Sequence, residues 1–203
     1  MIIDINSLSG DRVYHTLTQT LIPRPVAWVL SDNGEKDNFN LAPFSYFTAV
    51  SSKPALLMVS VGKKPDGILK DTRLNLIERK KCVVHIASAD LAEKVTHSAA
   101  TLVHGESEVE HLGLATVEFE GFALPRLACC DIAYACELYE YKEIAEQGLL
   151  FLQIKQIYLS DKVAQHTDKG RLVVDAEKVN PLARLGGSDY WVKGHSLSVQ
   201  RPK

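Results

Sequence analysis

Short apolar runs separated by turn residues dominate the pattern of the chain. These runs are Pro25–Leu30, Ala55–Val61, Cys82–Ala87, Ala115–Phe122, Ile132–Tyr141, Gly148–Leu159 and Arg171–Val174. They are rich in valine, isoleucine, tyrosine and phenylalanine, which is typical of β-strands. The segment Ser31–Gly34 after the first run predicts a tight turn, because Asn-Gly tolerates positive φ at both positions.

The spacing of apolar residues also predicts the fold class. Polar and apolar residues alternate in Ile132–Tyr139 and Phe151–Ile157, as in antiparallel strands that bury one face. Helical spacing follows two candidate N-caps: Asp71 or Thr72 with Leu74 and Ile77, and Ser88 with Leu91, Val95 and Ala99. Many strands and few helices in irregular order predict a mainly β fold, an antiparallel barrel with a few peripheral helices.

Composition and charge narrow the possible partners. The chain has 203 residues, 46% hydrophobic and 24% charged, and neither repeats nor linkers, which predicts a single domain over residues 1–203. Its 23 basic and 25 acidic residues give a formal charge of -2, so neither nucleic acid nor an anionic membrane is an expected partner. No apolar run reaches the ~18 residues of a membrane span, and Met1–Gly10 lacks the features of a signal peptide.

The cysteines indicate a reducing compartment. Cys82, Cys129, Cys130 and Cys136 form no Cys-x-x-Cys pair and are too sparse for a secreted disulfide scaffold. We therefore expect reduced thiols and a cytoplasmic protein.

Common enzyme and metal motifs are missing from the sequence. It contains no dinucleotide-binding glycine motif, no Walker A loop and no nucleophile elbow. The seven histidines show no metalloprotease spacing, so no metal is expected. His85, in an apolar run, is either a hydrogen-bonded core residue, which we favour, or a metal ligand.

The informative motifs are concentrated between Ile22 and Thr72, with further motifs in the middle of the chain and near residue 190. They are Pro23–Trp28 (PRPVAW), Asn40–Phe47 (NLAPFSYF), Val50–Pro54 (VSSKP), Lys70–Thr72 (KDT), His104–Glu108 (HGESE), Leu112–Leu114 (LGL) and Asn180–Tyr190 (NPLARLGGSDY). Each is weak alone. In this order and spacing, they closely resemble the flavin reductase-like family of FMN-binding split barrels, which includes flavoredoxins and the reductase components of two-component monooxygenases.

The resemblance implies an antiparallel split β-barrel with FMN as cofactor and NADH or NADPH as hydride donor. It also implies a homodimer and a partner oxygenase or other electron acceptor. The FMN-binding residues that it implies are Arg24, Trp28, Asn40, Leu41, Ala42, Ser45, Ser51, Lys70, Asp71, Thr72, Arg184, Gly186 and Tyr190. Within this set, the segments Arg24–Trp28 and Arg184–Tyr190 are implied to lie beside the cofactor, the second sometimes across a dimer interface.

Several of these residues suit an FMN phosphate on chemical grounds. Lys70 supplies charge, Thr72 a hydroxyl, and the start of a helix supplies free N–H groups and a positive dipole end. Asp71 would be repelled by a phosphate, so we expect it to cap the helix.

The segment from Asn40 to Ser45 is expected to form a flavin wall. Asn40 and Ser45 can hydrogen-bond the ribityl hydroxyls or the phosphate, and backbone groups of Leu41 and Ala42 can meet the polar edge of the ring. The simpler alternative is a strand start whose aromatic residues, Phe44 or Phe47 among them, pack in the core. For Trp28 also, core packing and a flavin contact are both open.

These residues favour an FMN-binding oxidoreductase. The hypothesis that we prefer is an NAD(P)H-dependent flavin reductase. Because hydride transfer to a flavin needs no dedicated acid or base, we name no catalytic side chain. The alternatives are a flavoredoxin-like electron carrier without direct NAD(P)H oxidation, and a non-catalytic barrel that has lost flavin binding.

Overall fold

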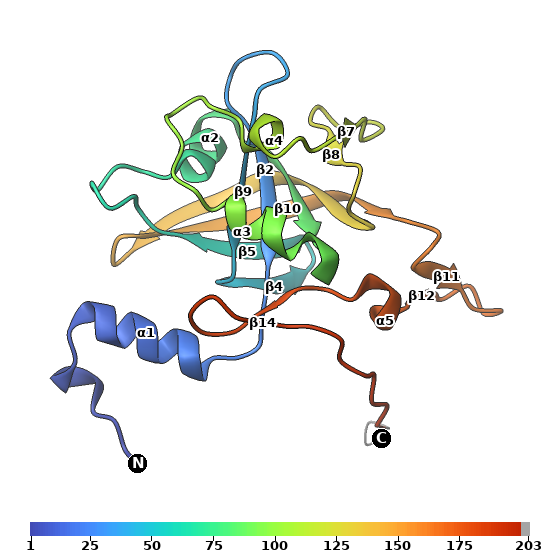
Figure 1. The fold of residues 1–203 in the computed structure, drawn as a ribbon. Helices are drawn as coiled ribbons and strands as arrows, with labels where there is room; N and C mark the ends of the chain where they lie inside the picture. The colour runs from blue at the N-terminus through green and yellow to red at the C-terminus, as the bar shows by residue number, and fades with distance from the viewer. Residues whose placement is uncertain (200–203) are drawn as a thin grey trace.

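A seven-stranded antiparallel sheet forms the body of the molecule, which the computed structural model describes over residues 1–199 (Figure 1). The strand order is β3-β2-β6-β9-β10-β5-β4, with β3 and β4 at the two edges, so the sheet is not closed. Its strands are β2 (Ala27–Asp32), β3 (Phe39–Phe44), β4 (Phe47–Ser52), β5 (Ala55–Val61), β6 (Lys81–Ile86), β9 (Ile132–Ile144) and β10 (Gln147–Leu159). The expected mainly β, antiparallel fold with peripheral helices is confirmed.

The buried positions of the strands explain their apolar sequences. Ala27 and Val29 on one face of β2 pack in one core cluster, and Trp28 and Leu30 on the other face pack in a second. Burial on both faces accounts for the continuous apolar run at this strand. The first half of β9 is likewise covered on both faces, and the strict alternation expected there is absent.

Three short sheets lie outside the main sheet. The first pairs β1 (Arg24–Pro25) with β13 (Ala183–Arg184) and β13 with β14 (Tyr190–Trp191). The others pair β7 (Thr116–Val117) with β8 (Arg126–Leu127), and β11 (Ala164–His166) with β12 (Leu172–Val174). The first sheet brings the N-terminal and C-terminal motifs side by side.

The strand expected over Ala115–Phe122 is wrong for most of its length. Only Thr116–Val117 pairs with another strand. Gly121 has a φ of +75°, and Phe119 and Phe122 reach the core cluster from a turn rather than from a strand. The apolar and aromatic residues of this run therefore predicted a longer strand than the one that forms.

The helices surround the sheet. They are α1 (Gly10–Thr20), α2 (Asp71–Arg79), α3 (Ala92–His97), α4 (Glu108–His111) and α5 (Ala176–Val179), with single 3-10 turns at Ile5–Ser7 and Ala89–Leu91. Figure 1 shows α2 and α4 on one side of the sheet, and α1 with the C-terminal segment on the opposite side. None of the described helices is long and apolar enough to span a membrane.

The two predicted helices exist. The predicted cap of the first is wrong, whereas Ser88 occupies the predicted N-cap position before the second. The N-cap of α2 is Lys70, and Asp71 is the first helical residue. Ser88 precedes the 3-10 turn without a capping hydrogen bond from its side chain, and Ala99 lies beyond the end of α3. The helix α1 was not predicted, and its apolar residues Tyr14 and Leu17 are exposed.

The turn expected at Ser31–Gly34 begins later. Strand β2 continues through Asp32, whose carboxylate accepts a hydrogen bond from the Gly34 N–H at 2.7 Å. Gly34 and Asp37 carry the positive φ values, +90° and +58°, rather than Asn33.

Candidate functional site

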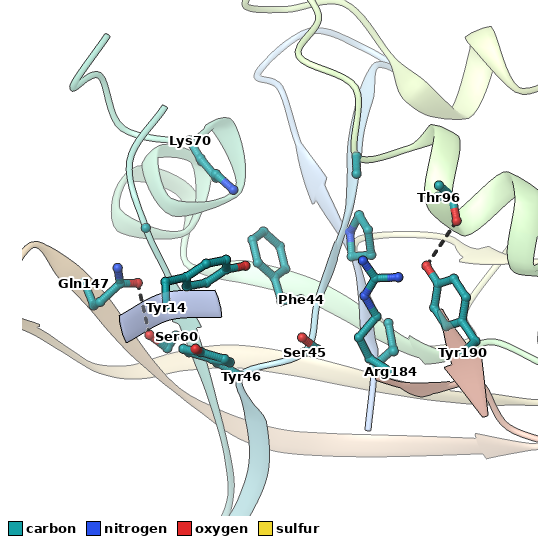
Figure 2. A pocket seen from close by; sticks show the side chains of 14 residues that line it. Tyr14, Phe44, Ser45, Tyr46, Ser60, Lys70, Thr96, Gln147, Arg184 and Tyr190 are labelled. Carbon is teal, nitrogen blue, oxygen red and sulfur yellow. Dashed lines mark hydrogen bonds between the residues drawn. The ribbon is translucent and has the colours of Figure 1, made fainter. Parts of the chain in front are cut away.

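A cavity of about 370 Å³ lies where the end of β3, the start of α2, α3 and the C-terminal strands meet (Figure 2). Fourteen residues line it: Tyr14, Val26, Pro43, Phe44, Ser45, Tyr46, Ser60, Gly62, Lys70, Thr96, Ala99, Gln147, Arg184 and Tyr190. The volume falls in the range of small-molecule sites. Four of the sequence-predicted residues, Ser45, Lys70, Arg184 and Tyr190, meet here.

Lys70 and the start of α2 form one side of this cavity. Lys70 is the N-cap of a nine-residue helix, and no side chain among the described residues caps it. The Lys70 Nζ atom lies 5.8 Å from the centre of the Phe44 ring. Burial there lowers the pKa of Lys70 below its ordinary value of 10.5. An uncapped helix start beside a lysine favours a bound anion.

Asp71 is neutralised by its neighbours instead of capping the helix. Its carboxylate lies 2.9 Å from the Lys64 Nζ atom and 2.6 Å from the His104 Nδ1 atom. Burial raises the pKa of Asp71, but hydrogen bonds from Lys64 and His104 outweigh it and hold the pKa below its ordinary value. The acidic side chain therefore leaves the helix start free for an anion.

Asn40 and Thr72 are buried behind the cavity and bind each other. The Asn40 Nδ2 atom donates to Thr72 Oγ1 at 2.8 Å and to Ser31 Oγ at 3.3 Å. Asn40 is 4% exposed and Thr72 1% exposed. Their side chains hold α2 against β3, and neither side chain lines the cavity.

Arg24 connects three segments at the base of the cavity. Its guanidinium donates to the carbonyls of Thr18 and Leu21 near the end of α1, and to the Leu185 carbonyl at 2.8 Å. Its Nε atom donates to Ser45 Oγ at 3.3 Å. The side chain is buried, so Arg24 positions Ser45 from behind instead of facing the cavity.

Trp28 and Leu41 belong to the core. The Trp28 indole N–H donates to Ser98 Oγ at 2.8 Å, and its side chain is fully buried. The Leu41 N–H donates to the carboxylate of Glu108 at 2.8 Å, so it is not free for a ligand. Burial raises the pKa of Glu108.

Three further predicted residues also lie outside the cavity lining. Ala42 is half-buried within β3. Ser51 is exposed on β4, where its Oγ atom accepts a hydrogen bond from the Lys53 N–H at 3.2 Å. Gly186 is buried against α1, and a Cβ atom there would lie 2.3 Å from the Gln19 side chain.

Arg184 and Tyr190 form the side of the cavity opposite Lys70 (Figure 2). The Arg184 Cζ atom lies 4.7 Å from the centre of the Tyr190 ring, and the guanidinium donates to the Gly187 carbonyl. The Tyr190 hydroxyl lies 3.1 Å from Thr96 Oγ1 on α3. These contacts hold the guanidinium in one orientation.

Sequence reasoning missed several residues that line the cavity. Tyr14 comes from the unpredicted helix α1, and Thr96 from α3. Ser60 and Gln147 lie on neighbouring strands, with Ser60 Oγ 3.3 Å from Gln147 Oε1. Only the pairing of β5 with β10 brings these two residues together, so no local motif indicated them.

His85 is a core residue, as we favoured. The Leu127 N–H donates to His85 Nε2 at 2.9 Å, and His85 Nδ1 lies 3.1 Å from the Trp28 carbonyl. Burial lowers its pKa to about 4, so the ring is neutral. Among the described residues, no group of three or more potential ligands could hold a metal ion.

Known proteins resemble this chain in sequence and in fold. A model of the flavin reductase like domain matches residues 19–182. The nitrilotriacetate monooxygenase component B of Bacillus cereus is 31% identical, with a TM-score of 0.86 over 98% of each chain. The 2-nitrobenzoate 2-nitroreductase of Pseudomonas fluorescens is 27% identical, with a TM-score of 0.87 over 100% of this chain and 96% of the other.

The open sheet also matches a known architecture. A Shewanella frigidimarina protein with a split barrel domain superposes with a TM-score of 0.84 over the whole of both chains, at 18% identity. The family model covers most of the chain, including the end of β3, the start of α2 and both cores. The chain therefore belongs to the flavin reductase-like family, and it is a flavin-related oxidoreductase with a split-barrel fold.

Proposed function

We propose that this protein is an NAD(P)H-dependent flavin reductase that binds FMN in the cavity between Lys70 and Arg184. The observation that carries the proposal is the uncapped start of α2 with Lys70 beside it, at one end of a cavity of about 370 Å³. A phosphate placed there would meet a cation and free backbone N–H groups. The residues present therefore fit the phosphate end of FMN.

The remaining lining suits the body of the flavin. Phe44 and Tyr46 offer ring faces, and Ser45 offers a hydroxyl that Arg24 holds in place. Val26, Pro43 and Ala99 offer apolar surface. A bound flavin supplies two-electron redox chemistry, and the protein's own task is to hold it, orient it and limit its contact with water.

The proposal is tested by mixing the purified protein with FMN and either NADH or NADPH and following nicotinamide absorbance. We expect oxidation well above the blank that contains flavin alone. Tight FMN binding without such oxidation would instead favour a flavoredoxin-like electron carrier, and no FMN binding would favour a non-catalytic barrel. A titration of the protein with FMN determines whether FMN stays bound or turns over as a substrate.

We further propose that the electrons pass to a partner oxygenase or another acceptor, and that the protein works as a homodimer. The similarity to a monooxygenase component B supports the first part. The homodimer is supported by exposed apolar side chains on α1 and at its C-cap: Tyr14 is 63% exposed, Leu17 45% and Leu21 62%.

We also propose a cytoplasmic protein with one domain over residues 1–203. The four free thiols fit the reducing conditions of the cytoplasm.

A further inference from the structure

The cavity holds two cations and no carboxylate. Lys70 and Arg184 are the charged residues among the fourteen that line it, and Figure 2 shows them on opposite sides. The lysines and arginines in ion pairs of the described residues are others: Lys63, Lys64, Arg73, Arg79, Lys155 and Lys178. Arg184 is half-buried and Lys70 is exposed, and neither has a carboxylate partner among the described residues, so the cavity suits negative groups.

One phosphate does not satisfy both cations. FMN carries a single phosphate, and the uncapped start of α2 beside Lys70 is the place in the cavity that suits it. Arg184 lies on the other side, away from that helix start. If FMN binds as proposed above, the flavin leaves Arg184 without an anion.

The contacts of Arg184 also orient it to bind an anionic group. The Arg184 guanidinium stacks on the Tyr190 ring, and the Tyr190 hydroxyl is tied to Thr96 on α3. Arg184 further donates to the Gly187 carbonyl, and its side chain is half-buried. A guanidinium fixed in this way offers paired N–H donors that match a carboxylate or a phosphate.

We propose that Arg184 binds the anionic group, a carboxylate or a phosphate, of the second ligand that shares the cavity with FMN. Two sources supply this chemistry: the phosphates of a nicotinamide dinucleotide, and the carboxylate of a small aromatic electron acceptor. In both cases Arg184 selects charged ligands over neutral ligands of the same shape. This inference rests on the proposed function, because it assigns FMN to the Lys70 side.

The test is calorimetric titration of the FMN-saturated protein with two pairs of probes. Benzoate and neutral benzamide report a carboxylate, and NAD⁺ and nicotinamide report dinucleotide phosphates. In the variant Arg184→Met, we expect benzoate, NAD⁺ or both to bind at least about tenfold more weakly, since a charged hydrogen bond is lost. Benzamide and nicotinamide should bind as before, and Arg184→Lys should restore part of the loss.

Arg126→Met is the matched control. The Arg126 Cζ atom lies 3.5 Å from the centre of the Tyr158 ring, in a similar stack, and Arg126 is outside the cavity lining. This variant should leave all four affinities unchanged. Loss with benzoate alone identifies the carboxylate source, and loss with NAD⁺ alone identifies the phosphate source.

Three results would overturn the inference. They are equal weakening of charged and neutral probes, no preference for charged probes in the unaltered protein, and a loss of preference for FMN over riboflavin in Arg184→Met. The titration is repeated without flavin. A charged-probe preference that persists in a protein unable to bind FMN would contradict the proposed function while leaving the anion site of Arg184 standing.

Discussion

At the scale of single residues, Lys70 differs from the lysines around it. Lys63 is paired with Glu143 at 3.7 Å and Lys64 with Asp71 at 2.9 Å, whereas Lys70 faces the cavity beside the start of α2. The three lysines are close in sequence, but only the fold assigns different partners to them. Lys70 is thus the lysine whose charge a ligand phosphate would meet.

We expect Lys70→Met to weaken FMN binding by about tenfold to a hundredfold, because one charged hydrogen bond is lost. Riboflavin, which has no phosphate, should bind as before, and Lys63→Met is the control that should leave both affinities unchanged. Quenching of flavin fluorescence measures each affinity. In the unaltered protein, FMN affinity should also fall as the pH rises towards the lowered pKa of Lys70, and equal losses for FMN and riboflavin would contradict this assignment.

The burial of His85 leads to a prediction of how the free energy of unfolding depends on pH. Its folded pKa of about 4 lies below the 6.5 of an exposed histidine, so the unfolded chain takes up the proton first as the pH falls. The free energy of unfolding should therefore decrease between pH 6.5 and pH 4, by about 3 kcal/mol from this residue, and not further below pH 4. Nitrogen NMR should show a neutral ring with its proton on Nδ1 at pH 6, and a titration midpoint near 6.5 would refute the buried assignment.

At the scale of elements, a buried arginine joins α2 to the hairpin of β9 and β10. Arg73 is fully buried and donates to the Glu146 carbonyl at 3.2 Å and to the Tyr141 hydroxyl, and it pairs with Glu143 at 2.9 Å. Gly148 on β10 leaves the space that its side chain fills. A Cβ atom at position 148 would lie 2.6 Å from the Arg73 Nε atom.

We expect Gly148→Ala to lower the free energy of unfolding by about 1–3 kcal/mol, because a buried arginine has little room to move. Gly10→Ala is the control: a Cβ atom there meets nothing within 4 Å, so its effect should be within about 1 kcal/mol and of either sign. Urea unfolding of both variants measures the difference. Equal stability of the two variants would show that Arg73 can leave its place freely.

At the scale of the whole molecule, α1 and its C-cap leave Tyr14, Leu17 and Leu21 largely exposed within the described chain. Tyr14 lines the cavity while it is also 63% exposed, so a second copy packed on α1 would border the same cavity. The edge strand β4 adds unpaired backbone groups. Both features favour the proposed homodimer.

Light scattering after size exclusion should give about twice the chain mass of 22.5 kDa. Replacing both Leu17 and Leu21 with lysine should produce a monomer, because it places charges on the proposed contact. Leu172→Lys, at a residue that is 51% exposed on β12, is the control and should remain dimeric. A monomeric unaltered protein would contradict the proposal.

The sequence by itself determined the fold class and the family. Short apolar runs and turn residues are local features, so the strands β2, β5, β6, β9 and β10 and the helix α2 were expected close to where they lie. The order of the motifs was sufficient to indicate a flavin reductase-like protein. The helix α1 was missed, although Val13, Leu17 and Leu21 recur at the four-residue spacing of one helix face.

Only the tertiary structure decided which motif residues face the cavity. Asn40, Thr72 and Trp28 carry polar groups that could meet a ligand, yet each hydrogen-bonds another buried residue. Lys70 and Arg184 are separated by more than a hundred residues and come to one cavity through the pairing of β1 with β13 and the packing of α2 on β3. The sequence determines the polarity of each side chain. Its hydrogen-bond partner depends on contacts between distant segments, because only the folded chain brings these segments together.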